Sequence, residues 1–157
     1  MPKVEMDATD HKILRYLMKN ARMPFLEIAR ECGISGAAIH QRVRKLTELG
    51  VINGTRLIVS PKTLGFDVCA IIGIKLQDPS YFDTTVAMLK NIPEIVDCYF
   101  ITGQYNILIK VYCRDNEHMM HTIFDGILKV TGIASTETFI SLSEVFSRQV
   151  YVEDMDK

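Results

Sequence analysis

The sequence of 157 residues has no tryptophan, only four cysteines and no long hydrophobic run. Its most apolar stretch, Val68 to Ile74, is far shorter than the ~20 residues that a membrane-spanning helix requires. The N-terminal residues lack the apolar core of a secretory signal. The cysteines are isolated, without the spacing of a zinc site or a disulfide framework, so we expect them to be small core residues. These absences indicate a cytoplasmic protein without membrane contact, metal or cofactor.

The motifs of common enzymes are absent as well. The sequence contains no Walker loop, no G-x-G-x-x-G and no G-x-S-x-G, which lowers the expectation of an enzyme. Hydrophobic residues make up 48% of the chain and charged residues 24%, a balance typical of folded globular proteins. A chain of this length can bury a sizeable core in one domain or two small ones.

The net charge of −1 conceals an uneven distribution of charge. Residues 1–60 carry ten Lys and Arg against six Asp and Glu, whereas residues 61–157 carry eight against thirteen. A basic first part joined to an acidic second part indicates two separate tasks, and the basic part favours a nucleic-acid partner.

The first part has the pattern of a helix-turn-helix unit. Asp7 is placed to cap a helix over about 8–20, and a second short helix after Pro24 ends at Gly33. Gly33-Ile34-Ser35 then forms a tight turn before a recognition helix over about 36–49. Helical spacing directs three apolar residues of this helix into the core, namely Ile39, Val43 and Leu46.

The outer side of the recognition helix predicts contacts with double-stranded DNA. Gln41 can bond the adenine edge and Arg44 the guanine edge, while Ala37 permits close approach to the groove. The full predicted interface comprises Arg22, Ser35, Ala37, His40, Gln41, Arg42, Arg44, Lys45 and Arg56, of which Arg22, Arg42, Lys45 and Arg56 are assigned to phosphate. His40 touches a base or a phosphate, or is only a solvated neighbour. A basic amphipathic helix alone would indicate no more than a solvated surface; the complete three-helix pattern favours DNA binding.

The second part alternates strands and helices in the order βαββαβ. The expected strands are 68–76, 95–102, 106–113 and 136–146, and the expected helices are about 81–91 and 116–130. This order predicts a ferredoxin-like domain with both helices on one face of an antiparallel sheet. Apolar residues occupy both alternating sets of positions in these strands, so both faces of the sheet are apolar. The face without helices must then be buried against another surface. We therefore expect a homodimer on a two-fold axis, whose paired heads read a near-palindromic operator.

The predicted fold is α+β, with an N-terminal three-helix helix-turn-helix domain and a C-terminal ferredoxin-like βαββαβ domain. We divide the chain into a DNA-binding domain (1–54), a hinge strand and linker (55–66), and an effector-binding and oligomerisation domain (67–157). The hinge strand rests on the β-branched content of Thr55–Val59.

Five segments together resemble the Lrp/AsnC family of transcription regulators, also called feast/famine regulatory proteins. They are MDATDHKIL, GISGAAIHQRVRKLTELGVI, SPKTLGFDV, ITGQYN and GIASTETF, in the order of the family. SPKTLGFDV and STETF are most similar to the AsnC branch, which responds to asparagine. The resemblance implies control of amino-acid metabolism genes, a small amino-acid effector bound between dimers, and assembly of dimers into octamers or other multiples.

The resemblance also implies the effector site. Its residues are Thr102, Gly103, Gln104, Tyr105 and Asn106 in the central hairpin, and Ser135, Thr136, Glu137 and Thr138 before the last strand. Backbone N–H groups beside Gly103 can bind a carboxylate, and hydroxyl and carboxylate groups can bind an ammonium. Each residue alone is equally consistent with a turn or strand role. The chain departs from the family at Asn106, where Asp is usual, and at Gly36-Ala37, where Pro then Ser or Thr is frequent.

Two other functions fit parts of the pattern. Haem-pathway decarboxylases have a similar head and body, but the intact basic face disfavours an enzyme. His118 and His121 have a spacing that could ligate a metal, although the polar edge of an amphipathic helix explains them better. A stand-alone amino-acid sensor acting through protein partners is the other alternative.

Overall fold

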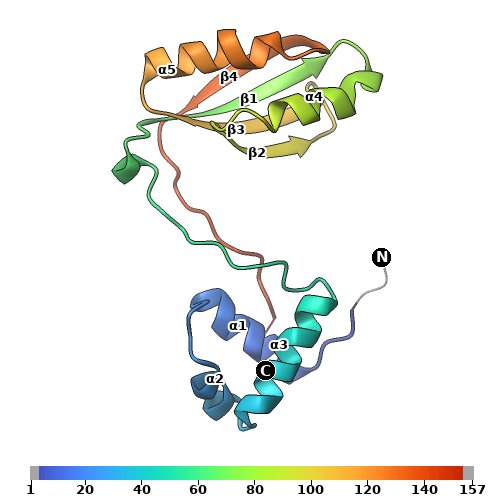
Figure 1. Cartoon of the computed structure of the whole chain (residues 1–157), viewed down its shortest axis with the longest axis vertical. Coiled ribbons are helices and arrows are strands. Elements are labelled where there is room, and N and C mark those ends of the chain that lie inside the picture. Colours follow the sequence, from blue (N-terminus) through green and yellow to red (C-terminus); the bar gives the residue numbers. More distant parts are fainter. Residues whose placement is uncertain (1–3, 154–157) are drawn as a thin grey trace. The chain divides into compact units, whose positions relative to one another are not determined.

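The computed structural model describes residues 4–153, which fall into two compact units (Figure 1). One unit contains the residues up to Ile58 together with those from Phe146 onward, and the other is Val59–Val145. In the described range, no helix is long and apolar enough to cross a membrane.

The first unit contains the three predicted helices, α1 (Ala8–Lys19), α2 (Phe25–Cys32) and α3 (Gly36–Glu48). The amide of Asp10 donates to Oδ1 of Asp7 at 2.8 Å, and the amide of Asp7 donates back to Asp10, which makes a capping box at the start of α1. Gly33 ends α2 with φ of 66°, a conformation that favours glycine. Ser35 caps α3 by accepting the amide of Ala38 at 3.2 Å.

The core of this unit confirms the predicted inner face of α3. Ile39 and Leu46 are buried, and Val43 packs against the same cluster. Ile13 of α1 and Ile28 of α2 complete it. The three helices therefore hold α3 with its opposite side facing solvent.

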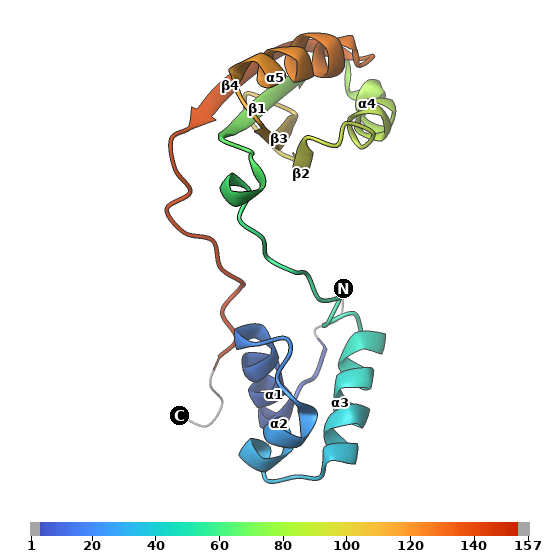
Figure 2. The ribbon, with the colours of Figure 1, turned by 60° about the vertical axis from the view of Figure 1, so that its left-hand side comes forward.

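The second unit is a four-stranded antiparallel sheet with helices on one face (Figures 1 and 2). Its elements are β1 (Val68–Leu76), α4 (Phe82–Leu89), β2 (Ile95–Phe100), β3 (Ile107–Cys113), α5 (Asn116–His121) and β4 (Ile133–Ser141), and the strand order is β2-β3-β1-β4. Ile72 and Ile74 of β1 are buried with Ile109 of β3 against Leu89 and Ile127 from the helical layer. This arrangement confirms the predicted ferredoxin-like fold.

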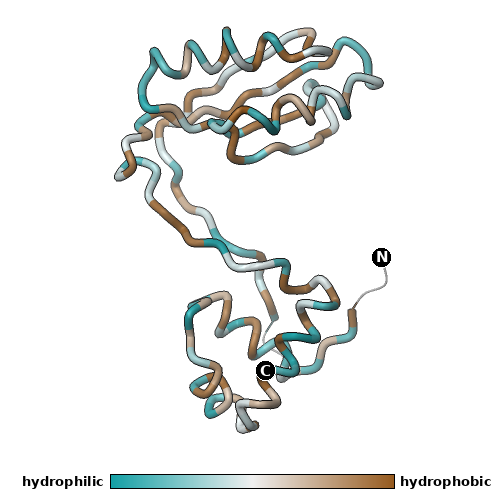
Figure 3. Tube along the Cα trace, in the orientation of Figure 1, coloured by the Kyte–Doolittle hydropathy of each residue, from teal (hydrophilic) through white to brown (hydrophobic). Residues whose placement is uncertain are grey.

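The other face of the sheet carries the alternate residues of each strand and is not covered by the helices. It presents apolar residues such as Ile71, Leu108 and Phe139, together with charged groups such as Lys110. Lys110 pairs with Glu144, which follows β4, at 2.5 Å. Figure 3 shows hydrophobic residues along the strands and along the linker before the sheet. We call this surface the open face.

Several predicted details differ in the structure. Thr55–Val59 is not a strand, because a strand requires a hydrogen-bonded neighbour and the single chain supplies none. For the same reason β4, which begins at Ile133 rather than at 136, ends at Ser141, and 142–146 pair with no strand in the described chain. After α5 the backbone continues as a π-helical turn (Thr122–Gly126) and a 3-10 turn (Ile127–Lys129). Cys98 is exposed rather than in the core, because β2 is an edge strand.

Candidate functional site

The outward side of α3 presents the residues predicted to read DNA. Ala37, Gln41 and Arg44 are exposed on one side of the helix, with Lys45 beside them. The Arg44 side chain is 81% exposed and forms a surface ion pair with Glu48 at 2.8 Å. Such a pair is weak, so the guanidinium can exchange Glu48 for another acceptor.

The other predicted interface residues lie around this helix. Arg22 and Arg56 are exposed in the segments after α1 and α3, and Ser35 is exposed at the start of α3. The ring of His40 contacts Phe25 edge-on, with the centroids 4.6 Å apart. This contact places the imidazole of α3 against the first residue of α2.

Arg42 has a different environment from the other basic residues. Its Nη1 atom lies 2.7 Å from Oδ2 of Asp7 and 2.7 Å from Oδ1 of Asp10, and its side chain is only 32% exposed. The hydrogen bonds that the Arg42 guanidinium donates to these two carboxylates raise its pKa. The sequence places Arg42 among the phosphate contacts, but the geometry gives it the role of joining α3 to α1, so we leave it out of the DNA-contacting set.

The hairpin between β2 and β3 is held against β1 through Asn106. Its amide donates to the carbonyl of Ile74 at 2.9 Å, and its side-chain Oδ1 accepts the amide of Leu76 at 2.9 Å. Its carbonyl accepts the amide of Ile101, which closes the hairpin. The side chain of Asn106 thus bonds the backbone beside the register shift of β1, and it supports the site rather than pointing freely into it.

Tyr105 lies over a glycine in the middle of β1. A β-carbon on Gly73 would lie 2.6 Å from Cδ2 of Tyr105, so only glycine leaves room for the ring. Gly73 pairs with Glu137 of β4 in the sheet register. Directly opposite side chains in a sheet are close neighbours, so Glu137 lies beside the position of the ring. Sequence reasoning missed Gly73, although a glycine inside a strand signals close approach of another group.

The predicted effector residues divide between the two faces of the sheet. Glu137 and Tyr105 lie on the open face, whereas Thr136 and Thr138 pair with Ile74 and Ile72, whose side chains are buried under the helices. The remaining hairpin residues, Thr102, Gly103 and Gln104, are exposed, and Ser135 is exposed opposite Lys75. Gly103 has φ of 122°, which favours glycine.

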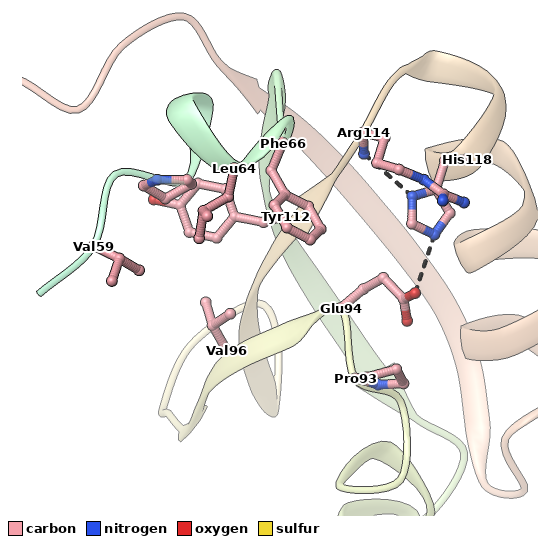
Figure 4. Close-up of a pocket in the computed structure, with 10 residues that line it drawn as sticks. Val59, Leu64, Phe66, Pro93, Glu94, Val96, Tyr112, Arg114 and His118 are labelled. Atoms are coloured by element: carbon pink, nitrogen blue, oxygen red, sulfur yellow. Dashed lines mark hydrogen bonds and ion pairs between the residues drawn. The ribbon is translucent and has the colours of Figure 1, made fainter. Parts of the chain in front are cut away.

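A pocket of about 510 Å³ lies where β1 and β2 begin, at the end of the sheet remote from the hairpin (Figure 4). Its lining is Val59, Pro61, Leu64, Phe66, Pro93, Glu94, Val96, Tyr112, Arg114 and His118. Nε2 of His118 lies 3.0 Å from Oε1 of Glu94, and the amide of Arg114 donates to Nδ1 of His118 at 3.2 Å. Because Nδ1 accepts the Arg114 amide, it carries no proton, and the ring proton is on Nε2. Nε2 therefore donates to Glu94. These polar groups are therefore bonded to one another, and the rest of the wall is mainly apolar.

Neither histidine of α5 belongs to a metal cluster. His118 contacts Glu94, and Nδ1 of His121 lies 2.9 Å from Oδ2 of Asp125. Within residues 4–153, no group of three or more His, Cys, Asp or Glu side chains could hold a metal ion.

The exposed face of α3 and the sheet unit together define a DNA-binding regulator with an attached ligand-binding domain. Residues 6–53 match the winged helix-turn-helix DNA-binding family, and residues 69–151 match the Lrp/AsnC ligand binding domain. The chain belongs to the Lrp/AsnC family of transcription regulators.

Relatives over almost the whole chain are regulators rather than enzymes. The regulatory protein AsnC of Escherichia coli K12 is 40% identical over 144 residues, which cover 92% of this chain and 95% of that protein. The HTH-type transcriptional regulator Ptr1 of Methanocaldococcus jannaschii is 43% identical over 82% of this chain and 86% of its own. The structure of E. coli AsnC matches with a TM-score of 0.88 at 39% identity, covering 94% and 99% of the two chains.

A further solved structure contains an amino acid. The feast or famine regulatory protein of M. tuberculosis complexed with L-methionine matches with a TM-score of 0.87 at 26% identity, covering 95% of this chain and all of that one.

Proposed function

We propose that this protein binds a near-palindromic operator as a homodimer and controls genes of amino-acid metabolism in response to a small amino acid. The observation that carries the proposal is the exposed α3 face with Gln41, Arg44 and Lys45, on a unit joined to a ligand-binding domain. Gln41 and Arg44 supply base-edge contacts, and Arg22, Lys45 and Arg56 supply phosphate contacts. Such a regulator acts in the cytoplasm, on chromosomal DNA.

The proposed effector site is the hairpin with the neighbouring part of the open face. Glu137 beside the Tyr105 ring offers a carboxylate and an aromatic face to an ammonium group. Exposed backbone at Gly103 offers donors to a carboxylate. Asparagine is the first candidate because SPKTLGFDV and STETF resemble the AsnC branch and the chain is 40% identical to AsnC of E. coli. The methionine complex of a relative supports an amino acid of some kind.

Assembly follows from the apolar surfaces that the single chain leaves exposed. The open face is the proposed dimer interface. Met120, Phe124 and Leu128 are exposed on the helical layer and support further assembly of dimers, for which we propose an octamer. An effector bound between dimers then favours one assembly over another, in proportion to its difference in affinity for the two.

Selection of specifically bound sites from random DNA, followed by a mobility-shift titration with and without L-asparagine, tests the proposal. We expect a specific shift that L-asparagine changes, and Tyr105→Ala should lose the response to L-asparagine while retaining the shift. Thr136→Val, which alters a side chain on the helix-covered face, is the matched control and should keep the response. Absence of any specific DNA shift, with L-asparagine still bound in calorimetry, would indicate the stand-alone sensor instead.

A further inference from the structure

The segment that follows β4 carries three exposed apolar side chains, those of Leu142, Val145 and Phe146. Leu142 is 98% exposed and Phe146 is 71% exposed. Arg148 places its guanidinium carbon 4.9 Å from the centre of the Phe146 ring, so an aromatic ring and a positive charge are held together. Residues 4–153 do not cover this ring, which remains largely in solvent.

The pocket beside β2 has the complementary features. Figure 4 shows Val96 and Glu94 across the opening from Leu64 and Tyr112. His118 uses Oε1 of Glu94, and among residues 4–153 the other carboxylate oxygen has no hydrogen-bond partner. The pocket therefore offers mainly apolar walls, with one free carboxylate oxygen of Glu94 and the Arg114 side chain at its edge.

We propose that this pocket receives Phe146 of a second copy of the chain, and that Arg148 of the second copy pairs with Glu94. The inference rests on the homodimer of the proposed function. It adds a specific exchange between copies, in which each chain supplies one ring and one pocket.

The sheet register places the two features correctly for a two-fold dimer. Cys69 of β1 pairs with Tyr112 on one side and with Ser141 on the other, so these residues form one row across the end of the sheet. The strand order puts β4 and β2 at opposite edges. A two-fold axis parallel to the strands, between two open faces, lays β4 of one copy over β2 of the other at the same end. The segment after Ser141 then reaches the pocket.

The direction of this axis follows from the chain path. The chain enters β1 and leaves β4 at the same end of the sheet, since Cys69 pairs with Ser141. An axis along the strands keeps these ends of both copies on one side, as a dimer with two DNA-reading units on one operator requires. A two-fold axis perpendicular to the strands and parallel to the sheets would instead place these ends of the two copies on opposite sides of the dimer.

The chemistry of the pocket favours a protein side chain over a polar small molecule. Most of its lining is apolar, and both ring nitrogens of His118 are already hydrogen-bonded, so a polar small molecule would find few partners there. Burial of an aromatic ring in an apolar pocket is a strong contribution to protein association, and a guanidinium beside a partly desolvated carboxylate adds orientation.

Charge exchange between full-length chains tests the proposal. Glu94→Arg and Arg148→Glu should each raise the dimer dissociation constant at least about tenfold, because each homodimer then carries two like-charged contacts. In a mixture of the two variants, every contact of the heterodimer is again between opposite charges. Native mass spectrometry of the mixture should show heterodimers in excess over random assortment, a result that an intrachain contact cannot produce.

Two further variants separate the ring from the charge. Phe146→Ala should weaken the dimer at least about tenfold. Leu26→Ala, which removes an exposed apolar side chain of α2 outside every proposed interface, should leave the dimer dissociation constant unchanged. Circular dichroism of each variant establishes that it is folded.

The outcomes distinguish this inference from the proposed function. Wild-type dimers with random mixing of the charge variants and no effect of Phe146→Ala would overturn the pocket exchange and leave the homodimer standing. A wild-type chain that sediments as a monomer would contradict the homodimer itself. Entry of a small apolar dye into the pocket of wild-type dimers, abolished by Val96→Glu, would show a small-molecule occupant and also overturn the exchange.

Discussion

Nη1 of Arg42 in α3 lies 2.7 Å from Oδ1 of Asp10 in α1, and this contact joins the recognition helix to the first helix. The same nitrogen bonds Oδ2 of Asp7, so one guanidinium satisfies both carboxylates of the capping box. Asp10 is 3% exposed, and a buried carboxylate requires such partners. The cap of α1 and the position of α3 are therefore coupled.

Replacement of Arg42 by Met should destabilise the helical unit by about 2–3 kcal/mol, because the buried Asp10 carboxylate loses its charged partner. Hydrogen exchange of α1 and α3 amides in the full chain measures this loss. Arg44→Met removes an exposed pair with Glu48 and is the matched control, with an expected change below about 0.5 kcal/mol. Equal exchange rates in the two variants would contradict the structural role of Arg42.

The contact of Arg42 with Asp7 makes the stability of the helical unit depend on pH in the acid range. Loss of solvent raises the pKa of the Asp7 carboxyl, but hydrogen bonds from the Asp10 amide and Arg42 outweigh it, so the pKa lies below 3.8. The unfolded chain therefore binds a proton at Asp7 more tightly than the folded chain does. The contribution of the Asp7 charge to the free energy of unfolding is complete above the ordinary Asp pKa, and it disappears as the pH falls through the lower pKa of the folded state.

Asp7→Asn isolates this charge, because Asn is an equally good N-cap. The difference in stability between wild type and Asp7→Asn should be constant near neutral pH and should shrink between about pH 4 and about pH 2. Denaturation of both proteins across this range, followed by far-UV circular dichroism, measures it. A difference that does not change with pH would show that the charge of Asp7 contributes nothing.

Gly73→Ala should destabilise the sheet unit by about 1–3 kcal/mol, because the new methyl group would overlap the Tyr105 ring. The displaced ring should also weaken the response to L-asparagine while the DNA shift is retained. Thermal unfolding and the mobility shift measure the two effects.

Two further variants serve as controls for the Gly73→Ala substitution. A β-carbon on Gly126 would lie 3.6 Å from Ile92, an ordinary contact, so Gly126→Ala should leave the L-asparagine response intact. Addition of Tyr105→Ala to Gly73→Ala should cost less than the sum of the two single changes, because the overlap is removed. Strict additivity would mean that the ring and the glycine do not interact.

The sequence predicts the elements well where local signals and burial agree. Asp7, Gly33 and Ser35 mark helix ends that the structure confirms, and apolar spacing predicts the buried side of α3. It fails at Thr55–Val59, where β-branched residues indicate a strand that has no neighbour within the chain. Secondary-structure propensity describes a residue, whereas a strand requires a partner.

Contacts between distant segments were beyond sequence reasoning for the same physical reason. A basic residue on α3 reads as a phosphate ligand until Asp7 and Asp10 are seen beside Arg42. Likewise, alternation gives the two faces of β4 but does not say which face the helices cover. The register with β1 decides that Glu137 lies on the open face and Thr136 does not.

The two exposed basic residues of α3 should have separable effects on DNA binding. Arg44→Ala removes a side chain placed to bond guanine, so it should cost about 1–3 kcal/mol on the preferred operator and much less on unrelated DNA. Lys45→Ala removes a phosphate contact, so it should weaken binding to both DNAs similarly and reduce the salt dependence of the binding constant by about one unit in slope. Titrations of operator and unrelated DNA at several salt concentrations measure both quantities. Loss of affinity by the same factor on both DNAs in the two variants would mean that Arg44 also contacts phosphate, and that base recognition depends on Gln41 and other residues of the exposed face.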